Sequence, residues 1–235
     1  MYKITFYILF VFCLNCLGQT NDSLIYDRYN TEGLASLDSE KYCEALTAFN
    51  NAIKTDPNQS DAYYYRACTN AAMHKKEGAF DDFAKAIALD PDFTQAYYHR
   101  GMFFADLGDF ETAISDYNKS IELYPKYLDA YNSRGIARFE TEDIMGAIQD
   151  FTSAIKLAPK DITGYAYRGA IKNESGDYKG AIKDLNKALK IDPQNAWSYY
   201  YRGRARYNLG YKKGADSDEA MAAKLGYYDD SYADE

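Results

Sequence analysis

The chain has 235 residues, of which 47% are hydrophobic and 26% charged, so it can bury a sizeable core and does not have the composition of a disordered protein. Acidic residues outnumber basic ones, and the formal net charge is -8 at pH 7. Such a surface repels nucleic acid and anionic membranes, which disfavours functions that depend on a basic patch.

The first 18 residues have the pattern of a secretory signal peptide. One basic residue, Lys3, precedes an apolar run over residues 4–14, and the small residues Cys16 and Gly18 stand ahead of Gln19. The run is shorter than the ~20 apolar residues that a membrane span needs. We therefore expect cleavage after Gly18 and export to the periplasm or the cell exterior.

Two alternatives to cleavage after Gly18 stay open, a lipid-modified Cys16 and an uncleaved membrane anchor. A lipid-modified Cys16, which would make the protein a membrane-anchored lipoprotein, is the main alternative, although Asn15 is larger than the residue usual before such a cysteine. Loss of residues 1–18 removes Lys3 and no acid, leaving 26 basic and 35 acidic residues and a net charge of -9. Residues 19–25 are expected to form a short linker.

Four cysteines are divided between the signal peptide and the mature chain. Cys13 and Cys16 have C-x-x-C spacing, but they lie in the segment expected to be removed, so we assign them no redox or metal role. Cys43 and Cys68 fall in different phases of the repeat described below. We expect two small buried apolar residues, with a disulfide as the alternative in an oxidising compartment.

A motif recurs at a fixed period of 34 residues, which is typical of a repeat architecture. It reads AYYYRA at 62–67, AYYHRG at 96–101, AYNSRG at 130–135, GYAYRG at 164–169 and SYYYRG at 198–203. A frame that starts at Tyr26 gives six copies, at 26–59, 60–93, 94–127, 128–161, 162–195 and 196–229. Residues 230–235 then form a short acidic tail.

Four positions of the copy are nearly constant. Position 4 is always tyrosine: Tyr29, Tyr63, Tyr97, Tyr131, Tyr165 and Tyr199. Position 8 is small: Gly33, Ala67, Gly101, Gly135, Gly169 and Gly203. Position 20 is always alanine, from Ala45 to Ala215, and position 32 holds all five prolines: Pro57, Pro91, Pro125, Pro159 and Pro193.

These positions predict a helical hairpin in every copy. Small residues at positions 8 and 20 let two antiparallel helices approach closely, and the large side chains at position 24 fill the space beside them. Gly108, Gly176 and Gly210 supply the turn between the helices in three copies, and proline follows the second helix in five. The chain is therefore expected to be all-α.

The pattern of Tyr, Gly, Ala, aromatic residue, Ala and Pro over 34 residues resembles the tetratricopeptide repeat. The resemblance covers residues 26–229 and implies a right-handed α-solenoid of six hairpins, whose first helices line a concave groove for a protein or peptide. The sequence departs from the family at Glu32 in copy one, at Ala67 in copy two, and in copy six, where Glu219 replaces the aromatic residue and proline is absent. We interpret residues 216–225 as a polar C-terminal cap.

Five copies carry arginine at position 7, where the family usually has leucine, and aspartate at position 23. Copy one has neither, so we expect one Arg–Asp pair inside each remaining hairpin. We interpret these pairs as devices that set the angle between the helices, with phosphate or carboxylate anchors along the groove as the alternative. The expected pairs are Arg66 with Asp82, Arg100 with Asp116, Arg134 with Asp150, Arg168 with Asp184, and Arg202 with Asp218.

If the hairpins stack as the resemblance implies, positions 2, 5, 9 and 12 face the groove. The candidate groove residues are Tyr64, Tyr98, Met102, Asn132, Ile136, Phe139, Trp197, Tyr200, Arg204 and Tyr207. This aromatic and thioether surface suits a neutral, apolar or cationic peptide. Acids at position 13 disfavour an acidic C-terminus as ligand: Asp38, Asp106, Glu140 and Glu174. The alternative is that individual side chains only pack one helix against the next.

Nothing in the sequence favours an enzyme. His74 and His99 lack metal-ligand spacing, and neither a G-x-S-x-G elbow nor a P-loop occurs, so we expect no cofactor and no metal. The leading hypothesis is an exported scaffold for protein–protein interaction. The alternative is a carbohydrate or cell-wall ligand-binding protein that uses surface tyrosines, since the chain has 25 of them.

Overall fold

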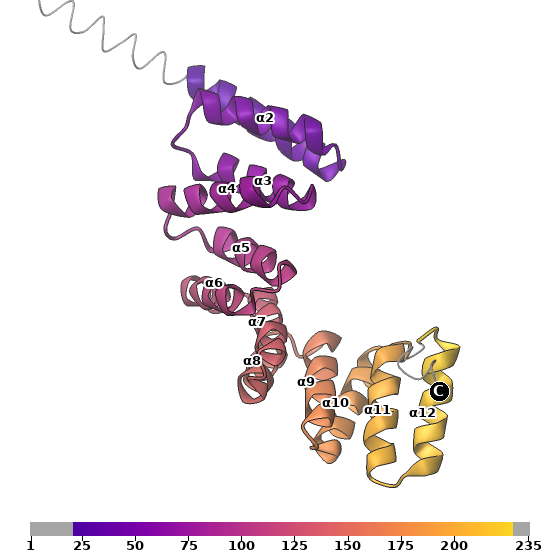
Figure 1. Ribbon diagram of the computed structural model, residues 1–235. Coiled ribbons are helices and arrows are strands. Elements are labelled where there is room, and N and C mark those ends of the chain that lie inside the picture. Colours follow the sequence, from indigo (N-terminus) through magenta and orange to yellow (C-terminus); the bar gives the residue numbers. More distant parts are fainter. Residues whose placement is uncertain (1–20, 228–235) are drawn as a thin grey trace, which may run out of the picture. The chain divides into compact units, whose positions relative to one another are not determined.

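A computed structural model of the chain describes residues 21–227, and all regular structure within them is helical. A helix over residues 21–38 is followed by α2 (Tyr42–Thr55), α3 (Ser60–Ala72), α4 (Lys76–Leu89), α5 (Thr94–Asp106), α6 (Phe110–Leu123), α7 (Leu128–Glu140), α8 (Ile144–Leu157), α9 (Ile162–Glu174), α10 (Tyr178–Ile191), α11 (Ala196–Asn208) and α12 (Lys212–Lys224) (Figure 1). The expected all-α fold of six consecutive helical hairpins is confirmed.

The helices follow the 34-residue period of the sequence. The first helices of copies two to six begin at position 1 of the copy, and the second helices of all six copies begin at position 17. Residues 21–25, expected to form a linker, are instead the start of the first helix. The expected signal peptide and the tail over 230–235 lie outside the described residues.

The turn between the two helices of each copy uses a left-handed residue at position 15. Three copies place glycine there, with φ of 79° to 85°, which glycine adopts without steric strain. The other three place a larger residue there, with φ of 57° to 63°. The six residues are Glu40, His74, Gly108, Glu142, Gly176 and Gly210.

The core is a row of large side chains at position 24 packed beside the alanines of position 20. Phe49, Phe83, Tyr117, Phe151 and Leu185 are all at most 1% exposed. In the last hairpin, position 24 is Glu219, which is exposed. A polar α12 is consistent with the expected cap, because a solenoid ends with a helix that presents polar groups outward.

The described residues divide into two compact units, unit 1 up to residue 103 and unit 2 from residue 104, and the division falls within α5. In unit 1, α3 packs against both α2 and α4. In unit 2, each helix from α6 to α12 packs against the next, and α9 also contacts α7 and α11 (Figure 1). The first helices of the last three hairpins therefore lie next to one another.

Candidate peptide-binding face and its arginine ladder

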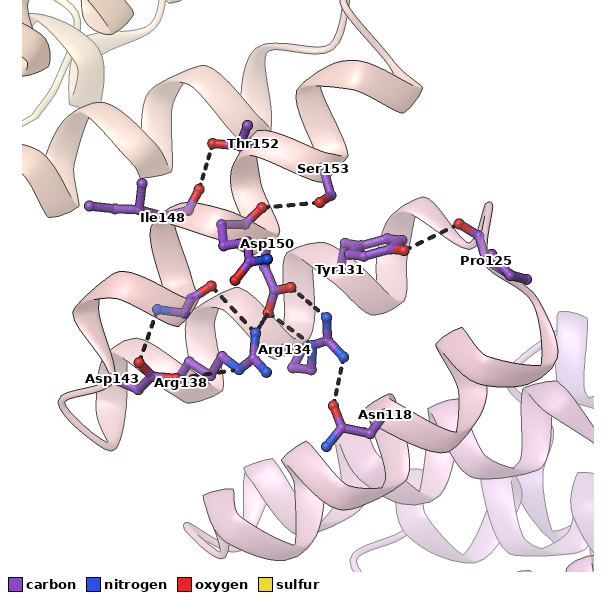
Figure 2. Close-up of polar contacts among 12 residues, drawn as sticks. Asn118, Pro125, Tyr131, Arg134, Arg138, Asp143, Ile148, Asp150, Thr152 and Ser153 are labelled. Carbon is purple, nitrogen blue, oxygen red and sulfur yellow. Dashed lines mark hydrogen bonds and ion pairs between the residues drawn. The ribbon is translucent and has the colours of Figure 1, made fainter.

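The arginine at position 7 binds the aspartate at position 23 of its own hairpin through two hydrogen bonds. These repeated arginine–aspartate pairs, with the side chains bound to them, are called the arginine ladder. In the fourth hairpin, Arg134 donates from Nε to Asp150 Oδ2 over 2.9 Å and from Nη2 to Oδ1 over 2.5 Å (Figure 2). The same geometry joins Arg66 to Asp82, Arg168 to Asp184, and Arg202 to Asp218, at 2.6–2.9 Å. Arg100 and Asp116 belong to different units, and their pairing stays a prediction.

The same arginine also binds the preceding hairpin, through its remaining terminal nitrogen. Arg134 Nη1 donates to Asn118 Oδ1 over 2.6 Å, so that one guanidinium links α7, α8 and α6 (Figure 2). Sequence reasoning missed these acceptors, although all stand at position 25. The equivalent pairs are Arg66 with Asn50 at 2.6 Å, Arg168 with Thr152 at 2.9 Å, and Arg202 with Asn186 at 2.7 Å.

A second donor, at position 11, approaches the same carboxylate. Arg138 Nη1 donates to Asp150 Oδ2 over 2.8 Å, and Asp150 is 1% exposed. The carboxylate is thus held between two guanidinium groups, which offset the cost of burying its charge. The equivalent donors are Lys172 on Asp184 at 2.8 Å, Arg206 on Asp218 at 2.7 Å, and Asn70 on Asp82 at 3.2 Å.

The tyrosine at position 4 lies beside the guanidinium. The Cζ of Arg134 is 5.5 Å from the centroid of the Tyr131 ring, and the corresponding distance from Arg202 to Tyr199 is 5.2 Å. A guanidinium at this distance from a tyrosine ring is attracted to it electrostatically. The tyrosine of position 4 therefore belongs to the ladder in these two hairpins, whereas in the fifth hairpin the cation beside the Tyr165 ring is Lys187, 6.0 Å from its centroid.

In unit 1, the candidate groove residues differ in their exposure. Tyr64 was expected at the groove surface, but it is only 8% exposed. Its hydroxyl lies 3.0 Å from Nδ1 of His99, and its ring lies 4.9 Å from that of Phe93. Tyr98 is half-buried and Met102 is 39% exposed, so of these three side chains only Met102 presents a large surface to solvent.

In the fourth hairpin, the candidate groove residues belong to the packing of unit 2. Ile136 and Phe139 are half-buried and pack against the cluster of Ala147, Phe151 and Ile171. Asn132 is also half-buried, and its Oδ1 is enclosed without a hydrogen-bond partner. For Ile136 and Phe139, the packing alternative raised by the sequence is the better description.

Helix α11 holds both packed and exposed candidates. Trp197 lies between Tyr167 and Tyr201, with ring centroids 5.1 Å and 4.5 Å away, and Tyr200 lies 4.8 Å from Tyr227. One and two turns further along α11, Arg204 and Tyr207 are exposed.

Arg204 and Tyr207 present different chemistry to solvent. Arg204 donates to Glu174 of α9 over 3.0 Å and still leaves 42% of its side chain exposed. Tyr207 is 69% exposed. They share the face of α11 that carries Tyr200, because residues four and seven positions further on return to the same side of a helix.

The prediction of two buried cysteines is wrong for Cys43, which is exposed, and Cys68 is half-buried. Both thiols are free, so the structure does not contain the disulfide that was the alternative. Burial raises the pKa of Cys68 to about 12, which keeps this thiol protonated and unreactive at neutral pH.

Residues 21–227 contain neither a metal-binding cluster nor a membrane-spanning helix. No group of three or more histidine, cysteine, aspartate or glutamate side chains within this range could hold a metal ion. None of the helices in the same range is long and apolar enough to cross a membrane.

Comparison with known proteins identifies the repeats. Tetratricopeptide repeat family models match residues 30–92 and 94–127, and a third model, described as TPR repeat, matches residues 169–210. No curated protein matches the sequence.

Several solved structures share the fold at low sequence identity. PilF of Pseudomonas aeruginosa is 18% identical, with a TM-score of 0.75 over 88% of this chain and 94% of its own. PilW, a type IV pilus biogenesis factor, is 18% identical, with a TM-score of 0.74 over 87% and 96%. YrrB, a TPR protein with an unusual peptide-binding site, is 20% identical, with a TM-score of 0.67 over 76% and 92%. The period, the paired helices and the family matches together show that the chain is a tetratricopeptide repeat protein.

Proposed function

We propose that this protein is a non-enzymatic scaffold that binds a peptide segment of another protein on the exposed face of α11. The tetratricopeptide repeat is a scaffold typical of protein–protein interaction, which supports the general class. Tyr207 and Arg204 are the principal contacts. The observation that carries the proposal is the exposure of Tyr207, at 69%, beside an exposed arginine on a helix whose other aromatic residues are packed.

The aromatic packing below this face favours binding. The rings of Phe151, Tyr167, Trp197, Tyr201 and Tyr200 form a continuous series, with successive centroids 4.5–5.2 Å apart. The Cζ of Arg204 lies 5.7 Å from the centroid of the Tyr200 ring in this series, so the arginine side chain is partly held in place and loses less conformational entropy when a ligand binds. Tyrosine and arginine are also the residue types that, with tryptophan, most often dominate binding energies at interfaces.

The charges around α11 favour a neutral or cationic ligand segment. Glu174 contacts Arg204 and Glu140 is exposed on α7, while the whole chain has a net charge of -8. An apolar or aromatic ligand side chain would pack against Tyr207. The negative net charge of the chain disfavours a strongly acidic ligand, while Arg204, whose charge Glu174 offsets, can donate to a ligand carbonyl. Peptide binding is also described for YrrB, which shares the fold.

The carbohydrate alternative has weaker support than peptide binding, because some of the tyrosines that suggested it lie beside cations of the protein itself. The large number of tyrosines suggested sugar-binding faces, yet the tyrosine of position 4 lies close to a cation in several hairpins, as Tyr131 does with Arg134 and Tyr199 with Arg202. The excess of tyrosine is partly explained by the ladder.

Photo-cross-linking tests the proposed face. A p-benzoylphenylalanine in place of Tyr207 retains an aromatic side chain and is expected to form adducts with a peptide or protein ligand in the native compartment. The matched control carries the same group in place of Met145 on α8, which is 76% exposed. Equal adduct formation at both positions, or none at position 207, would exclude α11 as the binding face.

We also propose that the protein is exported. The basis is the signal-peptide pattern of residues 1–18, and we expect the intact mass of the mature protein to correspond to a chain that begins at Gln19. A mass that corresponds to a lipid-bearing N-terminal Cys16 would overturn cleavage after Gly18 and favour the lipoprotein alternative.

A further inference from the structure

An open pocket of ≈ 630 Å³ lies in the first hairpin, between the helix over residues 21–38 and α2. Its walls carry two carboxylates and three uncharged polar side chains, and alanine and cysteine complete it. The lining residues are Glu32, Ala35, Ser36, Cys43, Glu44, Thr47, Ala48 and Asn51.

This pocket occupies the place of the arginine ladder in the first hairpin. Glu32, Ser36 and Ala48 stand at positions 7, 11 and 23 of the copy. In the fourth hairpin these positions hold Arg134, Arg138 and Asp150, and both arginines donate to the Asp150 carboxylate. The first hairpin thus has space where other hairpins hold a guanidinium. Its carboxylate, Glu32, lies on the first helix of the copy, whereas the aspartate of the other hairpins lies on the second helix.

The polar groups of the pocket are suited to accept hydrogen bonds from a cation. Thr47 Oγ1 donates to the Cys43 carbonyl over 2.9 Å, which leaves its lone pairs available as acceptors. The charged partners of the two carboxylates, Arg28 for Glu32 and Lys41 for Glu44, are each 3.7 Å away, and all four side chains are more than half exposed. Such surface ion pairs are weak and exchange readily with a better partner.

We propose that this pocket receives an arginine side chain presented by a partner protein. Glu32, Thr47 and Asn51 line the same pocket, and the planar guanidinium, with five N–H donors in a fixed fork, suits a carboxylate beside uncharged oxygens better than the compact, strongly hydrated ammonium of lysine. The fold already accommodates a guanidinium at the equivalent place in four other hairpins. This site lies in unit 1 and is independent of the α11 face, so either can fail without the other.

End-to-end stacking of two copies of the chain is not supported by the contacts that join neighbouring hairpins. Between neighbouring hairpins, the ladder joins an arginine at position 7 to an acceptor at position 25. The first hairpin has Glu32 at position 7, and the last has Ala220 at position 25. Stacking of the last hairpin of one copy on the first hairpin of another would therefore lack both members of this contact.

Titration of the isotope-labelled full chain with N-acetyl-arginine amide tests the proposal by nuclear magnetic resonance. We expect saturable shifts confined to backbone amides of residues 32–51. The isosteric neutral N-acetyl-citrulline amide is expected to cause none, and N-acetyl-lysine amide a weaker response. Glu32→Gln should weaken arginine binding by about tenfold, as expected for loss of a charge-assisted hydrogen bond.

A double variant, Glu32→Arg with Ala48→Asp, installs the ion pair of the other hairpins and should abolish binding while the melting temperature does not fall. Equal shifts with citrulline or lysine, or arginine binding unaffected by both variants, would overturn the proposal. Self-association of the wild type that disappears in the double variant, measured by sedimentation, would instead assign the pocket to a second copy of the chain.

Discussion

Replacing Asp150 with alanine is expected to lower the free energy of unfolding by about 3–5 kcal/mol, because removal of one partner leaves the others buried without compensation. Asp150 is 1% exposed and accepts from Arg134 and Arg138, whose side chains are only 13% and 21% exposed. Denaturant unfolding of the variant and the wild type measures the loss. The matched control is Glu122→Ala, which removes an ion pair with Lys119 whose side chains are 69% and 36% exposed, and it should cost less than about 1 kcal/mol.

The coupling within the cluster gives a second, sharper measure. The double variant Arg134→Met with Asp150→Leu should lose much less free energy of unfolding than the two single variants lose in total. The reason is that the double variant removes both members of the pair and leaves neither charge buried alone. Arg138 still has the Asp143 carboxylate 3.6 Å away. If the two single losses simply add, the ion pair seen in Figure 2 does not contribute to stability in solution.

The pairing inside the ladder could be predicted because the first copy lacks both members together. The residues at positions 11 and 25, which bind the aspartate and the arginine of each pair, could not be predicted so readily, because their residue types vary from copy to copy. A carboxylate accepts a hydrogen bond from any N–H donor, so position 11 is filled by Asn70, Arg138, Lys172 and Arg206 with the same effect. Position 25 is asparagine or threonine where it accepts from the arginine, and the repetition of asparagine at residues 50, 118 and 186 was the available signal.

Periodicity predicted the face on which the groove residues lie, but it could not predict their exposure. A helical period shows which side chains point the same way. It does not show how closely the neighbouring first helix approaches, and that distance decides whether a ring is covered. Trp197 is partly covered by Tyr167 from α9, whereas no ring among residues 21–227 covers Tyr207 in this way, and Tyr207 is 69% exposed.

The close approach of the two helices at position 8 leads to a second large effect. Gly33→Ala is expected to lower the free energy of unfolding by about 1–3 kcal/mol, as over-packed cores do. A Cβ on Gly33 would lie 2.5 Å, 2.7 Å and 2.8 Å from three atoms of the Phe49 ring, and Phe49 is 0% exposed, so the ring has no free space into which it can move. Denaturant unfolding again provides the measurement.

The same substitution in the last hairpin is the matched control. At Gly203, the nearest atoms to an added Cβ are the Asp218 Cβ at 3.4 Å and the Ala215 carbonyl oxygen at 3.5 Å, which are ordinary contact distances. The space exists because position 24 of this hairpin is Glu219, whereas in the first hairpin it is Phe49, whose ring lies against the glycine. Gly203→Ala should therefore be neutral or stabilise the protein by up to about 1 kcal/mol, since alanine favours a helix over glycine. Equal losses in Gly33→Ala and Gly203→Ala would show that the spacing of the two helices is set by the repeat as a whole, and not by the ring at position 24.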